Sequence, residues 1–490
     1  MRERLFSELP EKVIRYLFEP AIENEMERSF QNMMDVNKAH LSMLMSEGIV
    51  SETAGHTIMQ ALIEIQAAGV EQLKIGHHLE DLYFNIEQGL IDRVGIEVAG
   101  QLSIGRSRDD FDAVVIRMNS RDGLQKVCKL VLKLRAILIE RVDDYCDLDL
   151  NGYIHMQSLE PVTLGNYFSA TLHALERDFT RIQKALQQSN VSPLGLGGMA
   201  GTAFSINRDK VARLLGFTDT MKNSLDGIAS CDYILESLSA MNIFMSHINR
   251  LSYDLYMLSR EEYGIVEFGD ADTVTDGMMH KKKSLITAEH IKAKSSHVLA
   301  AVVSATHIPY GHYRGLAGES TKYFWGALNE VEAAVELLLE AMQTMEFKEP
   351  EMLERASDHF SIVTELTDLL VGEARISIRR AHQLIGHLIN HIFQHQMSFK
   401  QLDAELIEQL SIQMFGKRIS VPQEKIENAL RSVTKVEAKK VQSGSVSREV
   451  KNQLERLKHK LLQDEIWMTQ QVQKNHWSKD KLKNNLRQTP

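Results

Sequence analysis

The sequence has few cysteines and no long apolar run, and each shortage excludes a class of protein. Its three cysteines, in 490 residues, are too few and too scattered for a disulfide framework or a Cys-x-x-Cys metal site. No apolar run reaches the roughly 18 to 20 residues of a membrane span, and the N-terminus lacks the apolar stretch of a signal peptide. We therefore expect a protein of the reducing cytoplasm with no membrane partner.

A basic excess is also missing. The chain has 56 Lys and Arg against 66 Asp and Glu, a formal net charge of −10, whereas proteins that coat nucleic acid usually carry a basic excess. We therefore expect no nucleic-acid partner. The 43% of apolar residues is typical of a globular protein, and at roughly 150 residues per domain the length suggests about three domains.

Prolines are scarce, and their positions leave room for long helices. None of the eight lies between Pro20 and Pro161, or between Pro193 and Pro309. Apolar residues recur three or four positions apart in 328–345 and 450–462, which predicts helices. Strand-like alternation is scarce: residues 126–140 show some, but their length and straight-chain residues favour a helix. We predict an all-α fold. Residues 219–262 resemble one very long helix that is apolar on several faces, so it must pack between other helices or subunits.

Other segments indicate helix ends and loops. The Gly-rich stretch 193–204 separates two helical regions and lacks the Gly-Lys-Ser/Thr ending of a nucleotide-binding loop. Residues 267–284 combine Gly, Asp, Thr and a Lys triplet, which is typical of an exposed loop. The basic tail from 474 onward is predicted to be solvated and partly disordered, with binding of an anion as the weaker alternative. One late amphipathic helix is indicated by apolar residues at helical spacing: Val446, Val450, Leu454, Leu457 and Leu461.

The segment IGRSRDDFDA at 104–113 allows two interpretations. Ser107 with Asp110 three residues later has the pattern of a capping box, which only starts a helix. Arg106 and Arg108 beside that helix N-terminus also suit a carboxylate ligand. The local interpretation is the stronger one for this segment taken alone.

Two further segments carry polar groups suited to chemistry. His155 and Gln157 stand just before the break at Pro161, although a lone histidine is more often structural than catalytic. Lys281–Lys283 are ordinarily a solvated basic patch, but their place ahead of a helix start also allows them to grip an anion. The regularly spaced His387, His391 and His395 lack an accompanying HExxH motif, so we expect no metal ion and no cofactor.

Taken in order, these segments resemble argininosuccinate lyase, of the fumarase/aspartase superfamily. GRSRDD at Gly105–Asp110 is similar to the family's GRSRND, residues 155–161 to THLQ.AQP, and residues 270–289 to DAYSTGSSLMPQKKNP…E without gaps. The likeness continues through PLGLGGMAG, LGFTDTMKNSLD, EEYGIVEFGDA and KVQSGSVSREVKNQL, and so covers nearly the whole chain.

The resemblance implies an architecture as well as a chemistry. It implies three domains, at 1–104, 105–350 and 351–490, with a central bundle of long helices. It also implies a homotetramer whose active sites are shared between three subunits. The family's reaction releases fumarate from a dicarboxylate-containing small molecule, by removing a proton next to a carboxylate and stabilising the resulting dianion.

Residue by residue, the resemblance assigns four catalytic positions. Lys282 matches the lysine that grips the carboxylate, and His155 matches a histidine whose carboxylate partner is Glu289. The family's base serine is replaced by Asp276, which is a plausible base itself, and His280 is a second candidate. Substrate-binding positions are Ser107, Arg108, Asp109, Gln157, Ser284 and Arg314.

Several departures indicate a changed substrate. Asp109 replaces an Asn, Ser284 replaces another, and the segment around Arg314 lacks the Tyr, Gln and Lys of the leaving-group side. A site without those polar groups discriminates against the family's own substrate. We therefore expect an argininosuccinate-like lyase of amino-acid or specialised metabolism, acting on an altered N-succinyl substrate or running the reverse addition. The alternative is a catalytically silent scaffold or binding protein, which retention of His155, Glu289 and Lys282 disfavours.

Overall fold

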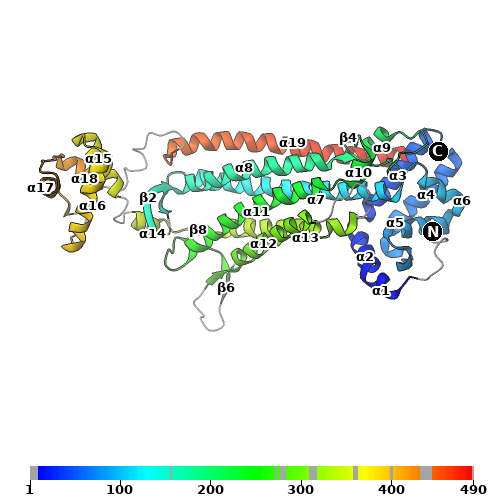
Figure 1. The fold of residues 1–490 in the computed structure, drawn as a ribbon, viewed down its shortest axis with the longest axis horizontal. Helices are drawn as coiled ribbons and strands as arrows, with labels where there is room; N and C mark the ends of the chain where they lie inside the picture. Colours follow the sequence, from blue (N-terminus) through cyan, green and yellow to red (C-terminus); the bar gives the residue numbers. More distant parts are fainter. Residues whose placement is uncertain are drawn as a thin grey trace.

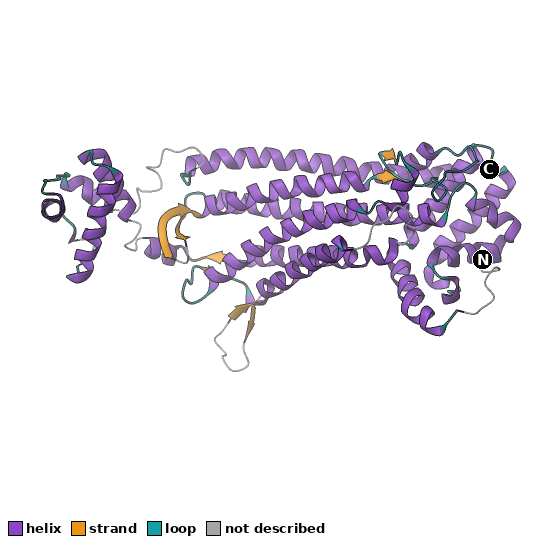
Figure 2. Cartoon of the chain, in the orientation of Figure 1, coloured by secondary structure: helices purple, strands orange, loops and turns teal. Residues whose placement is uncertain are grey.

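The computed structural model describes residues 9–154, 157–270, 273–275, 283–307, 317–356, 362–397, 401–430 and 444–487. Helices make up most of these residues, and the strands form only short two-stranded sheets (Figure 2). The predicted all-α class is therefore confirmed. None of the described helices is both long enough and apolar enough to cross a membrane.

Six long helices lie alongside one another in an elongated central bundle (Figure 1). Their apolar faces share the largest hydrophobic core, which is why helices that are apolar on more than one side occur here. The six helices are α7 (Arg108–Asp144), α8 (Leu164–Ser189), α11 (Asp232–Ser259), α12 (Ile286–Thr306), α13 (Ala317–Thr344) and α19 (Ser447–Arg487).

The N-terminal helices form a second core around the beginning of α7 (Figure 1). This core also takes in Leu194 and the short helix α9 (Arg208–Leu214) with the residues just after it. Its other elements are α3 (Phe30–Ser46), α4 (Glu52–Ala68), the 3₁₀ turns η2 (Val70–Gln72) and η4 (Gly100–Ser103), α5 (Leu82–Val94) and α6 (Ile96–Ala99), and Met26 of α2 (Glu19–Arg28) packs against it. The short elements α1 (Glu11–Val13), the π-helix η1 (Ile14–Phe18) and the 3₁₀ turn η3 (His77–Leu79) contain no buried residue.

A third core belongs to four helices near the other end of the molecule, α15 (Ile362–Ala374), α16 (Ile378–Gln394), α17 (Ala404–Phe415) and α18 (Gln423–Leu430). The division at 104 and 350 stays a prediction. The structure adds that the last helix, α19, shares the core of the central bundle through Val450, Leu454, Leu457 and Leu461. The amphipathic stripe predicted for this helix is therefore confirmed.

Two predictions about helix extent are wrong. Residues 219–262 are not one helix, because Asp219–Thr220 form strand β4 beside β3 (Val191–Ser192) and the short helix α10 (Ser224–Ala229) precedes α11. Asn223 caps α10 by accepting the Asp226 N–H, so a local cap and a tertiary strand pairing interrupt the periodic pattern.

The basic tail is the second error, because it was predicted to be partly disordered, whereas α19 continues through it to Arg487. Ser478 is buried there, and its hydroxyl donates to the carbonyl of Arg213 at 3.1 Å. The tail therefore packs against the N-terminal helices, on the side of α9.

Short antiparallel hairpins and strand pairs lie at the end of the bundle opposite the N-terminal helices (Figure 1). Strand β1 (Asp149–Ile154) pairs with β2 (Gln157–Thr163) directly after α7 ends. Strand β5 (Val266–Glu267) pairs with β8 (Glu346–Phe347), which is followed by α14 (Glu349–Ala356). Strand β6 (Thr273–Thr275) pairs with β7 (Lys283–Leu285) at the two ends of the predicted loop.

Candidate active site

Ser107 begins helix α7 with the capping box that the sequence predicts. Its hydroxyl accepts the Asp110 N–H at 3.3 Å, and the Asp110 carboxylate accepts the Ser107 N–H at 2.9 Å. The other oxygen of Asp110 accepts the Gly197 N–H at 2.8 Å. Burial raises the pKa of Asp110, and these backbone donors oppose the rise. One carboxylate therefore ties the start of α7 to the Gly-rich segment.

The Gly-rich segment forms a tight turn beside the N-terminus of α7. Gly197 has a φ of +61°, and a Cβ at this position would lie 2.4 Å from the carbonyl oxygen of Gly201. A Cβ at Gly198 would lie 3.8 Å from the hydroxyl of Ser107. The glycines thus allow the segment to pack directly beside Ser107, a structural role that the composition alone did not indicate.

Arg108 is surrounded by carboxylates of its own chain. Its Nε lies 2.7 Å from Asp81 Oδ2 and 3.8 Å from Asp112 Oδ2, and its Nη1 lies 3.3 Å from Glu80 Oε2. Burial raises the pKa of Asp81, and the charge of Arg108 opposes that rise. Within the single chain, carboxylates therefore compensate the positive charge of Arg108. Because three carboxylates surround one guanidinium, the formal charge of this group of residues is negative.

Glu25 adds another carboxylate to the same neighbourhood. It lies on α2, accepts the Leu82 N–H at 3.1 Å and is partly buried. Burial raises its pKa to about 7, the Leu82 N–H opposes the rise, and the charge of Asp81 adds to it. Asp109, by contrast, is exposed at the start of α7.

The second group of predicted residues belongs to the β1–β2 hairpin. Ile154 pairs with Gln157 at the end of this hairpin, so His155 falls between the two strands in sequence. His155 itself lies outside the described residues, and Gln157 is described only as part of strand β2. The geometry of the predicted histidine–glutamate pair therefore stays a prediction.

The third group belongs to the β6–β7 hairpin and the start of α12. Ser284 pairs with Val274 in the hairpin, and Glu289 stands in the first turn of α12. Glu289 is exposed in the single chain, and no other described side chain hydrogen-bonds to it. Four predicted residues lie outside the described part of the chain: Asp276, His280, Lys282 and Arg314.

One chain separates these groups widely. Helix α7 has 37 residues, and at 1.5 Å per residue it spans about 55 Å between Ser107 and the β1–β2 hairpin. Figure 1 shows the two at opposite ends of the bundle. The residues assigned to one site therefore cannot meet within a single subunit.

The part of the chain that the structure describes contains no candidate metal site. No group of three His, Cys, Asp or Glu side chains there could hold a metal ion. His391 and His395 stack with their ring centres 4.0 Å apart near the end of α16, and each is used locally, His395 Nδ1 bonding to the carbonyl of His391. The acidic residues Asp81 and Glu25 near Arg108 were not predicted from the sequence, although Asp81 ahead of an apolar-periodic run is a recognisable helix cap.

Solved structures show which class this architecture defines. EDDS lyase in complex with formate aligns with a TM-score of 0.87 at 24% identity, covering 99% of this chain and 96% of that chain. Class II fumarase from Schistosoma mansoni aligns with a TM-score of 0.69 at 12% identity, covering 83% and 90%. The chain therefore has the fold of the fumarase/aspartase lyases.

Sequence comparison narrows the class to one family. A lyase family model matches residues 15–300, and a model described as the argininosuccinate lyase C-terminal region matches residues 360–439. Argininosuccinate lyase 1 from Shouchella clausii is 38% identical over 465 residues, which are 94% of this chain and 93% of that protein. The chain belongs to the argininosuccinate lyase family and is a carbon–nitrogen lyase.

Proposed function

We propose that the protein releases fumarate from an N-succinyl compound related to argininosuccinate, or catalyses the reverse addition. In the forward direction a base takes a proton from the carbon next to a carboxylate, the carbon–nitrogen bond breaks, and the amine leaves with a proton from an acid. The dianion formed on the way needs cations and hydrogen-bond donors placed around it. Membership of the argininosuccinate lyase family over nearly the full chain is the observation that carries this proposal.

The roles proposed for individual residues follow the family pattern. Lys282 holds the carboxylate next to the reacting carbon, and the pair of His155 with Glu289 transfers a proton. Asp276 takes the place of the family's serine as the base. Burial under a closed loop would raise the pKa of such a carboxylate and make it a better base, whereas the nearby charge of Lys282 would oppose this. Substrate contacts come from Ser107, Arg108, Asp109, Gln157, Ser284 and Arg314.

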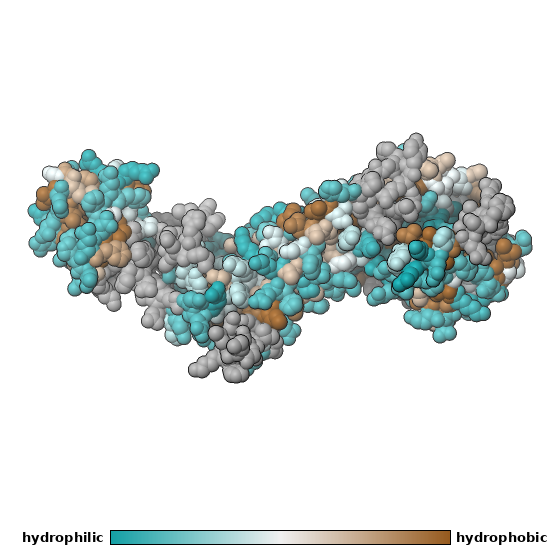
Figure 3. Space-filling view, turned by 60° about the horizontal axis from the view of Figure 1, so that its bottom comes forward, coloured by the Kyte–Doolittle hydropathy of each residue, from teal (hydrophilic) through white to brown (hydrophobic). Residues whose placement is uncertain are grey.

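We further propose that the active unit is a homotetramer with shared sites, located in the cytoplasm. The 55 Å or so between Ser107 and the β1–β2 hairpin supports this, because only ends from different chains can then form one site. Large apolar side chains exposed on the long helices support it too, as Figure 3 illustrates for the bundle surface. Each of the following is about half exposed: Tyr253, Leu299, Val303, Leu462 and Ile466.

Fumarate release tests the chemistry directly. The purified protein is incubated with argininosuccinate and with a panel of other N-succinyl amines, and the ultraviolet absorbance of fumarate is followed. Turnover of one compound supports the proposal, and we expect a compound other than argininosuccinate to be preferred, because Asp109 adds a carboxylate where the family has an Asn. No fumarate from any compound, together with no thermal stabilisation by any of them, would favour the silent scaffold instead.

A further inference from the structure

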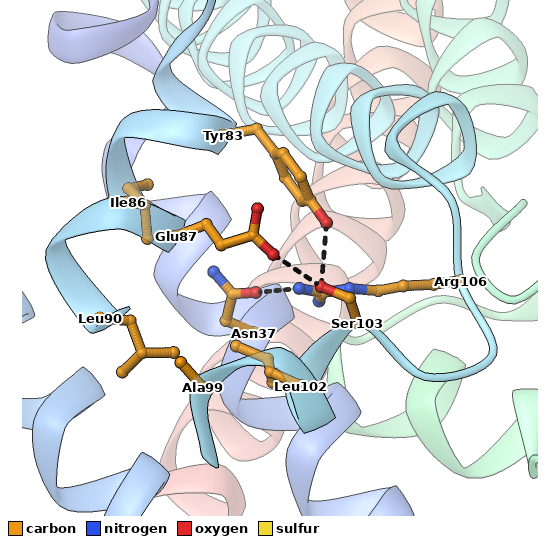
Figure 4. A pocket seen from close by; sticks show the side chains of 9 residues that line it. All are labelled: Asn37, Tyr83, Ile86, Glu87, Leu90, Ala99, Leu102, Ser103 and Arg106. Atoms are coloured by element: carbon orange, nitrogen blue, oxygen red, sulfur yellow. Dashed lines mark hydrogen bonds between the residues drawn. The ribbon is translucent and has the colours of Figure 1, made fainter. Parts of the chain in front are cut away.

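The turn that leads into Ser107 is anchored by Arg106, a half-buried arginine. Arg106 reaches back between α3 and α5, and its Nη2 donates to Asn37 Oδ1 at 2.7 Å (Figure 4). Its guanidinium carbon lies 4.9 Å from the ring centre of Phe111 and 5.7 Å from that of Tyr83. The remaining nitrogens, Nε and Nη1, are buried without a hydrogen-bond partner in the described part of the chain. Contacts with rings and one amide therefore hold this cation.

Neighbouring side chains hold the rest of the same turn. Tyr83 and Glu87 both bond to the hydroxyl of Ser103, at 3.3 Å and 3.2 Å, and the dashed lines in Figure 4 mark these bonds. On the opposite side the ring Nε2 of His40 donates to the carbonyl of Ile104 at 2.9 Å. The hydrogen-bonding anchors come from α3 and α5, and the ring of Phe111 on α7 packs against Arg106 as well. These contacts therefore hold the turn between the N-terminal helices and the start of α7.

The backbone of the turn contributes little to its own stability. Gly105 has a φ of +76°, and a Cβ there would lie 2.7 Å from Ile206 Cγ2. The Arg106 N–H makes only a long bond, 3.5 Å, to the carbonyl of Ser103. Side chains thus determine where the chain enters α7, and the next residue is Ser107.

The cavity around Arg106 is not itself a ligand site. Its volume is about 10 Å³, too small for a substrate, and it is lined by Asn37, Tyr83, Glu87, Ser103 and apolar side chains. Glu87 in its wall would also repel an anion. The arginine therefore works within the protein and not on a bound molecule.

We propose that Arg106 is a positioning residue for the lyase reaction: through its contacts with Asn37 on α3, Tyr83 on α5 and Phe111 on α7 it fixes the place of Ser107 and Arg108 at the substrate. This inference rests on the proposed function. The capping box sets Ser107 relative to α7 alone, whereas a shared site also needs the N-terminal helices and α7 in one fixed relation. Misplacement of a binding group by about 1 Å can cost about 100-fold in rate.

Two substitutions separate the charge of Arg106 from its shape. Arg106→Met keeps an unbranched side chain that can pack on the rings but loses the bond to Asn37, and we expect kcat/KM to fall about 100-fold. Arg106→Lys keeps the charge but lacks the planar group that stacks on Tyr83 and Phe111, so it should recover part of this loss. Thermal unfolding and the oligomeric state are measured for each variant, and kinetics are taken only below the unfolding transition.

Arg117 provides the matched control. It is buried on α7, its guanidinium lies 4.0 Å from the ring centre of Tyr233, and it donates to the carbonyl of Gln188 and to Ser230. It stands ten residues, about 15 Å, beyond Ser107. Arg117→Met should lower the unfolding temperature and leave kcat/KM of the folded enzyme unchanged.

A double substitution tests the route through Asn37. Asn37→Ala should lower kcat/KM on its own and add little in the Arg106→Met background, because both remove the same bond. Independent, additive losses would show that Arg106 does not act through this contact.

The outcomes distinguish this inference from the function on which it rests. If the wild-type protein releases fumarate and folded Arg106→Met is equally active, the positioning role is refuted and the function stands. The role is equally refuted if Arg106→Met and Arg117→Met lose activity only in proportion to their folded fraction. If the wild-type protein acts on no compound, the function and the positioning role are both refuted.

Discussion

The two ends of the central bundle are built in different ways. At the N-terminal end, Ser107 and Arg108 sit among packed helices, and their partners Asp110 and Asp81 are buried in the same chain. At the other end the predicted residues belong to short hairpins and to the start of α12. Glu289, the one predicted catalytic residue whose side chain is described, is exposed in the single chain. The first end is therefore held in place by contacts within one chain, whereas Glu289 at the second end has no such packing around it in the described part of the chain.

This difference explains how the proposed reaction divides between subunits. Groups that only bind and orient a substrate gain from a rigid setting, which the carboxylates around Arg108 and the cavity around Arg106 provide. Groups that transfer protons work best where water is excluded. In the proposed tetramer, another subunit would cover the exposed surface around Glu289 and exclude water from it. The predictions below change one end at a time, from the largest expected effect to the smallest.

The hairpin end should carry the chemical step. Asp276→Asn removes the proposed base without changing its size, and we expect kcat to fall about 10²- to 10⁴-fold, the usual range for a general base. The tetramer, measured by light scattering, should stay intact. His280→Asn is the companion variant: if it alone abolishes turnover and Asp276→Asn is fully active, the base is His280.

The stability of the central bundle should depend strongly on one buried ion pair. Arg135 on α7 and Asp464 on α19 are almost completely buried, with 2.7 Å between Nη1 and Oδ2. Asp464→Ala leaves the arginine charge buried without its carboxylate, which should lower the free energy of unfolding by about 3–5 kcal/mol in denaturant titrations.

The exposed pair on the same seam is the control for that measurement. Lys458 and Asp143 lie 3.1 Å apart and are 38% and 58% exposed, so Asp143→Ala should cost at most about 1 kcal/mol. Equal losses in the two variants would mean that the α7–α19 seam opens to solvent.

The N-terminal end should show a pH dependence caused by Glu25. Its pKa is about 7 in the folded chain and 4.5 without burial, so the folded state binds more protons between these values. The free energy of unfolding should therefore fall as pH rises from 4.5 to 7. The difference of about 2.5 between the two pKa values corresponds to about 3 kcal/mol.

Glu25→Gln removes this penalty. The variant should be more stable than the wild type at pH 8 by up to about 3 kcal/mol and no more stable at pH 4. Glu23 on the same helix is exposed, so Glu23→Gln should leave the pH profile unchanged. A wild-type profile that is flat between pH 4.5 and 7 would contradict the raised pKa.

The capping box should give the smallest effect on stability. Ser107→Ala removes the acceptor for the Asp110 N–H, which should lower the free energy of unfolding by about 1 kcal/mol. Ser107→Asp retains a cap, so its stability should be close to that of the wild type. If Ser107 also contacts substrate, both variants should lose activity. The loss of activity should then be larger than the fraction of unfolded protein accounts for.

The sequence predicted features that depend on neighbouring residues. The capping box of Ser107 and the apolar stripe of α19 follow from short spacings, and the structure confirms both. The break before α11 was missed because the pattern at Asn223, a cap followed three residues later by Asp226, was outweighed by the apolar periodicity around it.

Features that depend on tertiary contacts could not be predicted in this way. The carboxylates of Glu80 and Asp81 that balance Arg108 lie more than 25 residues before it, and no spacing rule connects them. Asn37, which accepts a hydrogen bond from Arg106, is farther still along the chain. The likeness to a family identified residues that match a motif, but it gave no information about the side chains that hold them in place.

Mixing two inactive variants tests the central claim most directly. Ser107→Ala damages only the helix end of each site, and His155→Asn damages only the hairpin end. Because Ser107 and His155 of one site come from different chains in this account, mixed tetramers should contain some sites with neither substitution and should release fumarate, although neither parent does. Mixed tetramers, verified by native mass spectrometry, that stay as inactive as both parents would contradict a site shared between subunits.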